Sequence, residues 1–198
     1  MDFVQGSSGK VEEMDHPGRL APAGLVFLGL MAPEHRLIPP TLANAATGYP
    51  PAFGDWRRSV VGSDTPDFVD TANKGWFDLS REGGLFGDDR EFLVAVEIDE
   101  GDHWWARVRL DEPWDIVGAG SAAALGIGFG APEFAMLSVT GDVIVCGRTG
   151  ESSIGAVLVN GFSDLAGLRQ LAEWKAGWRG TPQQEKAAAR RWLESVDH

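Results

Sequence analysis

The chain has 198 residues, of which 43% are hydrophobic and 23% charged, a composition typical of a globular protein rather than a disordered or fibrous one. Its net charge is −12, with most of the acidic excess in residues 81–162, which disfavours nucleic acid and anionic membranes as partners because phosphate binding needs clustered Lys and Arg. No apolar run is long enough for a membrane span, and a single cysteine excludes an intramolecular disulfide, so a cytoplasmic protein is expected.

The N-terminal half is predicted to be irregular around one buried strand. Residues 1–20 include the linker-like stretch QGSSGK, which is typical of a disordered segment. The apolar run at 25–31 predicts a buried strand. Several prolines within residues 32–60 then predict a long irregular excursion, because proline cannot donate to a ladder or sit inside a helix. Residues 68–79 are expected to form one short helix or an edge strand.

The C-terminal half shows clearer periodicity. Residues 91–110 predict a β-hairpin with an acidic turn, and residues 134–160 predict an antiparallel meander with glycine turns. Two amphipathic helices follow, and Ser163 and Thr181 are expected to cap them. The prediction is an α+β fold, with an antiparallel sheet and two C-terminal helices packed on it, in one domain of residues 21–198.

The hairpin combines carboxylates with two adjacent tryptophans. In the strand HWWARVRL, alternation places Trp104 on the core face and Trp105 on the face of the arginines, where its ring is expected to be exposed or to stack on an arginine. Tryptophan and arginine are enriched in binding hot spots. The predicted partner-binding surface consists of Asp99, Glu100, Asp102, His103, Trp105, Arg107, Asp111 and Glu112.

The glycine-rich tract 118–130 is a second unusual segment. Gly118-x-Gly120-x-x-Ala123 matches a loose dinucleotide-binding pattern, but the preceding strand is short and no acidic ribose partner follows, so a small-residue helix packed close to the sheet is expected instead. The hairpin and this tract also loosely resemble part of the N-terminal-nucleophile hydrolases of the proteasome type. Because the stretch HPGRLAPAG, directly before the first strand, holds no Thr, Ser or Cys nucleophile, the resemblance assigns no catalytic residue.

The remaining chemistry-bearing residues form no known motif. Cys146 lies in the middle of the apolar stretch VIVCG and is expected to be a small core residue. The sequence has neither H-E-x-x-H nor paired C-x-x-C, and no G-x-S-x-G. We therefore predict no catalytic residue, no metal ligand and no cofactor from the sequence.

Two functions are compatible with these features. The acidic middle and the eight tryptophans favour a protein-binding module, of the kind in which an immunity or antitoxin protein covers the cationic site of a basic partner protein with carboxylates. A homo-oligomer is compatible with the same features. The alternative is a small hydrolase-like enzyme or ligand-binding protein, with a pocket under the Pro-rich excursion near His35, Trp56 and the tract Gly118–Gly130. In that case His35 or His103 should lie in a cleft beside a nucleophile or a carboxylate.

Overall fold

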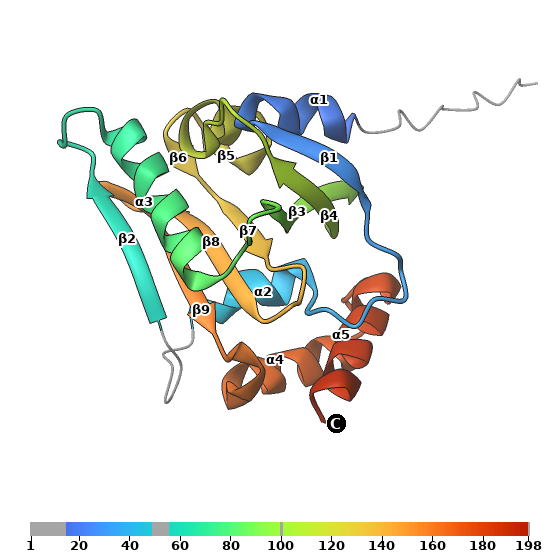
Figure 1. The fold of residues 1–198 in the computed structure, drawn as a ribbon. Helices are drawn as coiled ribbons and strands as arrows, with labels where there is room; N and C mark the ends of the chain where they lie inside the picture. Colours follow the sequence, from blue (N-terminus) through green and yellow to red (C-terminus); the bar gives the residue numbers. More distant parts are fainter. Residues whose placement is uncertain (1–14, 49–55, 100, 198) are drawn as a thin grey trace, which may run out of the picture.

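The computed structural model describes residues 15–48, 56–99 and 101–197 (Figure 1). Its centre is a seven-stranded antiparallel sheet with the strand order β1-β4-β3-β7-β8-β9-β2. The predicted α+β fold is confirmed. The strands of the sheet are β1 (Leu25–Leu30), β2 (Trp56–Gly62), β3 (Glu91–Asp99), β4 (Asp102–Leu110), β7 (Phe134–Leu137), β8 (Val143–Thr149) and β9 (Ser153–Asn160).

The predicted hairpin and meander both form. β3 and β4 pair from Glu91–Arg109 to Asp99–Asp102, and β7, β8 and β9 follow as neighbours in the sheet. A separate two-stranded ladder, β5 (Gly126–Gly128) with β6 (Ala131–Pro132), lies between the hairpin and the meander in sequence.

Helices cover both faces of the sheet (Figure 1). On one face, α3 (Phe68–Gly83) and the π-helix η2 (Ile116–Leu125) contribute to a core that includes Trp76 and Phe92. On the other face, a second core that includes Trp105 and Trp192 involves α2 (Pro40–Ala46), α4 (Ala166–Gly177) and α5 (Gln183–Val196). Successive residues of the central strands are therefore buried on opposite faces, as in a sheet sandwiched between helices.

The N-terminal half is more regular than predicted. Residues 16–20, placed in a disordered segment by composition, form α1 (His16–Leu20), because the Asp15 carboxylate accepts the N–H of Gly18 at 3.0 Å and a proline occupies the first turn. The short 3-10 helix η1 (Ala21–Ala23) leads from α1 into β1. Residues 1–14 lie outside the described part of the chain.

The Pro-rich excursion at residues 32–60 is also more regular than the sequence predicts. It contains α2, in which Pro40 is the first helical residue and so loses no hydrogen bond, and its end contains the start of β2. Residues 49–55 of the excursion lie outside the described residues. The segment at 68–79 is the helix α3, which extends to Gly83, and not an edge strand.

The two C-terminal helices exist, but their predicted caps are wrong. Ser163 belongs to the 3-10 helix η3 (Phe162–Asp164), and Leu165 is the residue before α4. Pro182, and not Thr181, is the residue before α5. Neither Leu165 nor Pro182 caps its helix with a side-chain hydrogen bond. At the C-terminal end of α4, the Arg190 guanidinium donates to the carbonyl of Ala176 at 2.9 Å and so provides a hydrogen-bond partner for one of the last carbonyls of the helix.

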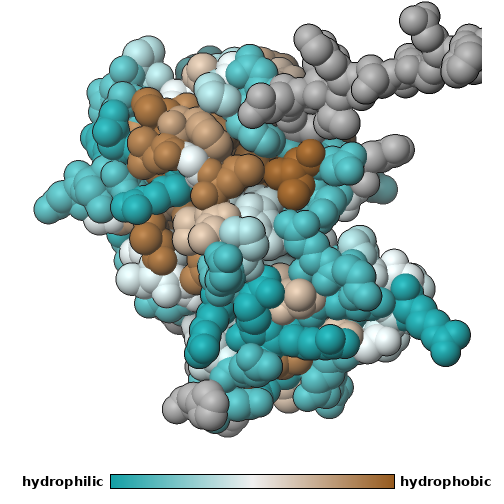
Figure 2. All heavy atoms as spheres, turned by 90° about the vertical axis from the view of Figure 1, so that its right-hand side faces the viewer, coloured by the Kyte–Doolittle hydropathy of each residue, from teal (hydrophilic) through white to brown (hydrophobic). Residues whose placement is uncertain are grey.

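Strand β1 is one of the two edges of the sheet, and its outer border carries no charged side chain. Leu28 and Leu30 are 43% and 46% exposed. The register with β4 shifts between Phe27 and Gly29, which marks a β-bulge. On the side of the molecule that holds β1 in Figure 1, apolar side chains gather in the upper part, and the lower part is mostly polar (Figure 2).

A single carboxylate organises the start of η2. The Asp115 side chain accepts the N–H groups of Gly118 and Ala119 at 2.8 and 2.7 Å, and the Asn73 amide at 2.7 Å. Asn73, buried on α3, in turn accepts the N–H of Val117 at 2.9 Å. These N–H groups are the ones that a dinucleotide phosphate would need, so Asp115 already occupies the position of the anion.

Removing this carboxylate should destabilise the protein in a pH-dependent manner. Partial burial raises the pKa of Asp115, but the hydrogen bonds from Ala119, Asn73 and Gly118 outweigh it and hold the pKa below its usual value. The stabilisation is therefore complete above the unfolded-state pKa and is lost as the pH falls through the lower, folded-state pKa. For Asp115→Ala we expect a loss of about 2 kcal/mol near neutral pH.

Urea denaturation of the wild type and of Asp115→Ala at several pH values measures this effect. The difference in the free energy of unfolding should shrink below about pH 4, where the unfolded carboxyl is protonated. Asp88→Ala, at an exposed turn, is the matched control and should change little. A difference that stays constant from pH 7 to pH 3 would contradict the role assigned to the ionised Asp115.

Candidate functional site

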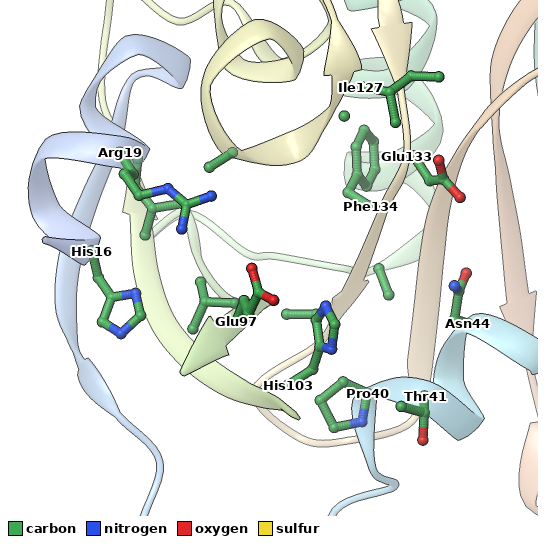
Figure 3. Close-up of a pocket in the computed structure, with 16 residues that line it drawn as sticks. His16, Arg19, Pro40, Thr41, Asn44, Glu97, His103, Ile127, Glu133 and Phe134 are labelled. Atoms are coloured by element: carbon green, nitrogen blue, oxygen red, sulfur yellow. The ribbon is translucent and has the colours of Figure 1, made fainter. Parts of the chain in front are cut away.

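A cleft of about 430 Å³ opens where β3 and β7 separate (Figure 3). The two strands pair only at Leu93–Leu137 and Val94–Met136, although β3 continues to Asp99. The residues that line it come from α1, α2, β3, β4, β7 and the segment around β5. Its volume lies within the range of small-molecule binding sites.

Main-chain groups of β3 face this cleft. The N–H of Leu110 donates to the carbonyl of Arg90 at 3.0 Å, so the even-numbered residues of β3 bond to β4. By alternation, the main-chain groups of Ala95 and Glu97 point to the other side, toward β7. Because the ladder to β7 ends at Val94, the main chain of Glu97 faces the cleft and offers a hydrogen-bonding edge to a ligand.

Glu97 and His103 are directly opposite each other on β3 and β4 and both line the cleft. They form a pair without mutual main-chain hydrogen bonds, the type in which side chains come closest. Figure 3 shows the carboxylate and the imidazole directed into the same space. The Glu97 carboxylate also accepts the N–H of Gly101 at 3.2 Å, which orients it at the hairpin turn. An imidazole beside a carboxylate can bind a polar group or exchange a proton with it.

Helix α1 supplies His16 and Arg19 on the opposite wall. Burial, and then the charge of Arg19, lower the pKa of His16 below its usual value, although Asp15 opposes the shift. The shift favours the neutral imidazole, which can donate or accept a hydrogen bond. Its ring also stacks on Phe27 of β1 with the centroids 5.8 Å apart, which fixes α1 against the sheet.

Helix α2 supplies the third polar wall through Thr41 and Asn44. The hydroxyl of Thr41 donates to Glu185 of α5 and accepts from Lys175 of α4, whose Nζ lies 3.1 Å away. Arg148 of β8 donates to the carbonyl of Asn44 at 2.7 Å. These bonds attach α2 to three other elements and hold its cleft-facing residues in place.

The upper part of the cleft in Figure 3 holds an apolar patch beside the charged side chain of Glu133. Phe134 of β7 and Ile127 of β5 lie there, while His103, Pro40 and Thr41 lie at the opposite end. Ile127 is 75% exposed, and Phe129 at the following turn is 68% exposed. The cleft therefore combines ionisable side chains on several walls with one apolar patch, and an exposed apolar lip lies beyond that patch.

The expected exposure of Trp105 is wrong. Trp105 is fully buried, and its indole N–H donates to the carbonyl of Ile38 at 2.6 Å. Trp104 is buried too, as predicted, and donates to the carbonyl of Met31 at 2.9 Å. Alternation misleads here because segments before and within α2 cover the face that the sequence assigns to solvent. Arg107 is exposed farther along the same face.

The predicted acidic residues are divided between the two ends of the hairpin. Asp99 and Asp102 pair at the turn, next to His103, and Glu100 lies outside the described residues. Asp111 and Glu112 follow the far end of β4, about 30 Å away at about 3.4 Å per residue. The structure therefore brings together only the residues at the turn.

Arginines neutralise part of this acidic surface. Arg90 binds Glu112 at 3.0 Å, and Arg109 lies 3.5 Å from Asp111. Arg107, assigned to the partner-binding surface, binds Glu91 at 2.5 Å across the hairpin. The charge that a basic partner would meet on the strands is smaller than the composition suggests.

His35 does not line the cleft. It packs on Trp104 with ring centroids 5.0 Å apart and borders a separate cavity of about 10 Å³, together with Asp102 and Glu185. Burial and the charge of Arg191 lower the pKa of His35. Burial and the charge of Glu185 raise the pKa of Asp102. This second cavity holds at most a water molecule. The side chain of Trp56 lies outside the described residues.

Cys146 is confirmed as a core residue. It is fully buried, its Sγ lies 3.8 Å from the carbonyl of Ala43, and burial raises its pKa to about 12. Among the described residues, no group of three His, Cys, Asp or Glu side chains is placed to hold a metal ion. In the same described part of the chain, every helix is too short or too polar to cross a bilayer.

The thiol of Cys146 should therefore be unreactive toward thiol reagents in the native state. We expect Ellman's reagent at pH 8 to modify Cys146 at least about a hundredfold more slowly in native protein than in urea-unfolded protein, because only the thiolate reacts. The absorbance at 412 nm measures the rate. Equally fast labelling in both states would show that the thiol is accessible in the native fold.

Sequence reasoning missed most of the cleft. His16 and Arg19 were assigned to a disordered segment, although the order Asp15, His16, Pro17 is itself a helix-start signal. Glu97 and Glu133 carried no motif, and only the fold places them together. The elements anticipated were His103 beside a carboxylate and a pocket bordered by the Pro-rich excursion and the Gly118–Gly130 tract. Comparison of the chain with protein-family models, with curated proteins and with solved structures finds no match.

Proposed function

We propose that the protein binds a small molecule in the cleft between β3 and β7. The observation that carries this proposal is the convergence of His16, Arg19, Glu97 and His103 on one cavity of about 430 Å³. Few convergent polar groups in a formed, partly apolar cavity are the usual mark of a ligand site. Residues of the Pro-rich excursion and of the Gly118–Gly130 tract line the cleft, as the alternative function suggested by the sequence requires, but His35 does not.

The geometry supports a ligand that combines polar or ionisable groups with an apolar part. Glu97 and His103 would meet polar groups of the ligand, and Phe134 and Ile127 its apolar part. The main chain of Glu97 adds an edge for an amide or a hydroxyl group. A cytoplasmic location, which the single cysteine favours, belongs to the same proposal.

Ligand-observed NMR with a fragment library of amphiphilic acids, amines and amides tests the proposal. Hits should bind the wild type with dissociation constants from about 10 μM to 1 mM, since a fragment of about 14 heavy atoms that gains about 0.3–0.5 kcal/mol per atom binds with about 4–7 kcal/mol. Glu97→Gln and His103→Ala should each weaken a polar hit at least tenfold, because each removes a group that faces the cavity. Glu151→Gln, at an exposed turn outside the cleft, is the matched control and should bind as the wild type does.

Two results would overturn the proposal. One is a library without any hit that competes for a single site. The other is a set of hits whose binding is the same in Glu97→Gln and His103→Ala as in the control variant. Both variants change groups at the hairpin surface, so a circular dichroism melt that matches the wild type establishes that they fold.

The acidic partner-binding function remains a prediction and is confined to the hairpin turn. Asp99 and Asp102 lie opposite each other there, whereas Asp111 and Glu112 at the far end of β4 are paired with arginines. A basic partner held there would lose affinity in Asp99→Asn and not in Asp111→Asn. Co-purification of such a partner from the native host, measured with both variants, distinguishes this function from ligand binding.

A further inference from the structure

Two tryptophans at the end of α4 are exposed to solvent. Trp174 and Trp178 are 52% and 50% exposed, and their rings stack with centroids 4.9 Å apart and planes 18° apart. We call this pair the tryptophan ridge. Every other tryptophan whose burial is described is buried or half-buried: Trp76, Trp104, Trp105, Trp114 and Trp192. α4, which ends in the ridge, lies at the bottom of the molecule in Figure 1.

The ridge is held in one arrangement before any partner arrives. The N–H of Trp178 donates to the carbonyl of Trp174 at 2.8 Å, and the N–H of Thr181 donates to the carbonyl of Trp178 at 3.3 Å. The Trp178 ring lies over Gly180, where an added Cβ would come within 2.6 Å of it. Rings fixed in this way lose little conformational entropy on binding, which favours their use as anchors.

Cations surround the ridge in a protein that is otherwise acidic. Arg179 is exposed beside Trp178, and Lys186 Nζ lies 3.5 Å from the Arg179 carbonyl. Arg190 of α5 donates to the carbonyl of Ala176, which lies between Trp174 and Trp178 in the sequence. Glu173 is the acidic neighbour of Trp174 on α4, so the immediate surroundings are net positive.

We propose that the tryptophan ridge docks an acidic, apolar-containing segment of another protein. Stacked aromatic rings next to arginine are the residue types of interface hot spots, and the cations would steer an acidic partner and repel a basic one. A second copy of the chain is disfavoured, because a two-fold interface would bring the cations of Arg179 and Lys186 against their own counterparts. An anionic membrane would meet the same cations, but its extended plane would also face the rest of a chain whose net charge is −12, which a short segment bound at the ridge does not.

A synthetic peptide in which Asp and Glu alternate with Leu and Phe is the probe. The protein is labelled with 5-fluorotryptophan and titrated under ¹⁹F NMR, with the signals assigned by single Trp→Phe variants. We expect the Trp174 and Trp178 signals to shift and the buried tryptophans to stay unchanged. Affinity should fall at least tenfold in Arg179→Glu and should be lost in the double variant Trp174→Ala/Trp178→Ala. Arg81→Glu, on α3, is the matched charge reversal and should have little effect.

Several outcomes would overturn the proposal. They are the absence of any shift at millimolar peptide, equal binding of a peptide with Lys and Arg in place of Asp and Glu, and binding that the double variant retains. Self-association in sedimentation velocity that Trp174→Ala abolishes would assign the ridge to a second copy. Ridge-dependent binding to phosphatidylserine vesicles would assign it to a membrane. Because both rings are half-exposed, the variants should melt within a few degrees of the wild type.

Discussion

Replacing Trp105 by alanine should cost about 4 kcal/mol of the free energy of unfolding. The ring is fully buried in the core beneath α2, and its N–H donates to the carbonyl of Ile38. The substitution leaves a large cavity and removes the indole N–H that donates to the carbonyl of Ile38. Urea denaturation followed by circular dichroism should show a lower midpoint with an unchanged m-value.

Two further variants separate the contributions to this loss. Trp105→Phe retains most of the ring volume and loses the indole N–H, so we expect a cost of about 1–2 kcal/mol. Trp174→Ala removes an equally large but half-exposed ring and should cost less than about 1 kcal/mol. Equal free energies of unfolding for Trp105→Ala and Trp174→Ala would contradict the assignment of Trp105 to the core.

Glu185→Ala is the second substitution with a large expected effect, about 3 kcal/mol. Glu185 binds Lys175 at 2.5 Å and accepts the hydroxyl of Thr41, and so joins α5 to α4 and α2. The side chains of Lys175 and Glu185 are only 20% and 13% exposed. Without Glu185, the ammonium group keeps its desolvation cost and loses its counterion, which is more costly than losing an exposed pair.

The double variant Lys175→Met/Glu185→Leu should recover most of this loss, because replacing a buried pair by apolar side chains leaves no unpaired charge. Glu194→Ala, an exposed position on the same helix, is the matched control and should change stability by less than about 0.5 kcal/mol. A thermodynamic cycle from urea denaturation gives the coupling energy. A double variant less stable than Glu185→Ala would contradict the explanation by an unpaired charge.

The strands and C-terminal helices were predictable because their side-chain periodicity is local. Residues 91–110 and 134–160 show alternation and glycine turns, and the apolar stripe of α4 and α5 is legible without knowledge of the rest of the fold. The start of α2 was predictable in principle from Pro40, since proline is favoured at the first helical position, but the density of prolines around it suggested irregular chain.

The burial of Trp105 and the composition of the cleft depend on contacts that sequence spacing does not encode. Whether the second face of β4 meets solvent depends on where residues 31–46 pass, and no local pattern in HWWARVRL reports that. The cleft likewise joins residues from His16 to Ala135 because β3 and β7 diverge after two pairs. The separation of two strands is a property of the sheet and not of either strand alone.

The bulge in β1 affects whether molecules of this protein can associate with one another through the edges of their sheets. A straight, uncharged border of LVFLGL would be a template onto which strands of other molecules could add one after another, as in fibril growth. The extra residue at Leu28 and the positive φ of 142° at Gly29 bend that border, so successive N–H and C=O groups no longer line up for an incoming chain. A small irregularity in one outer strand thus limits runaway polymerisation where no charge is present to do so.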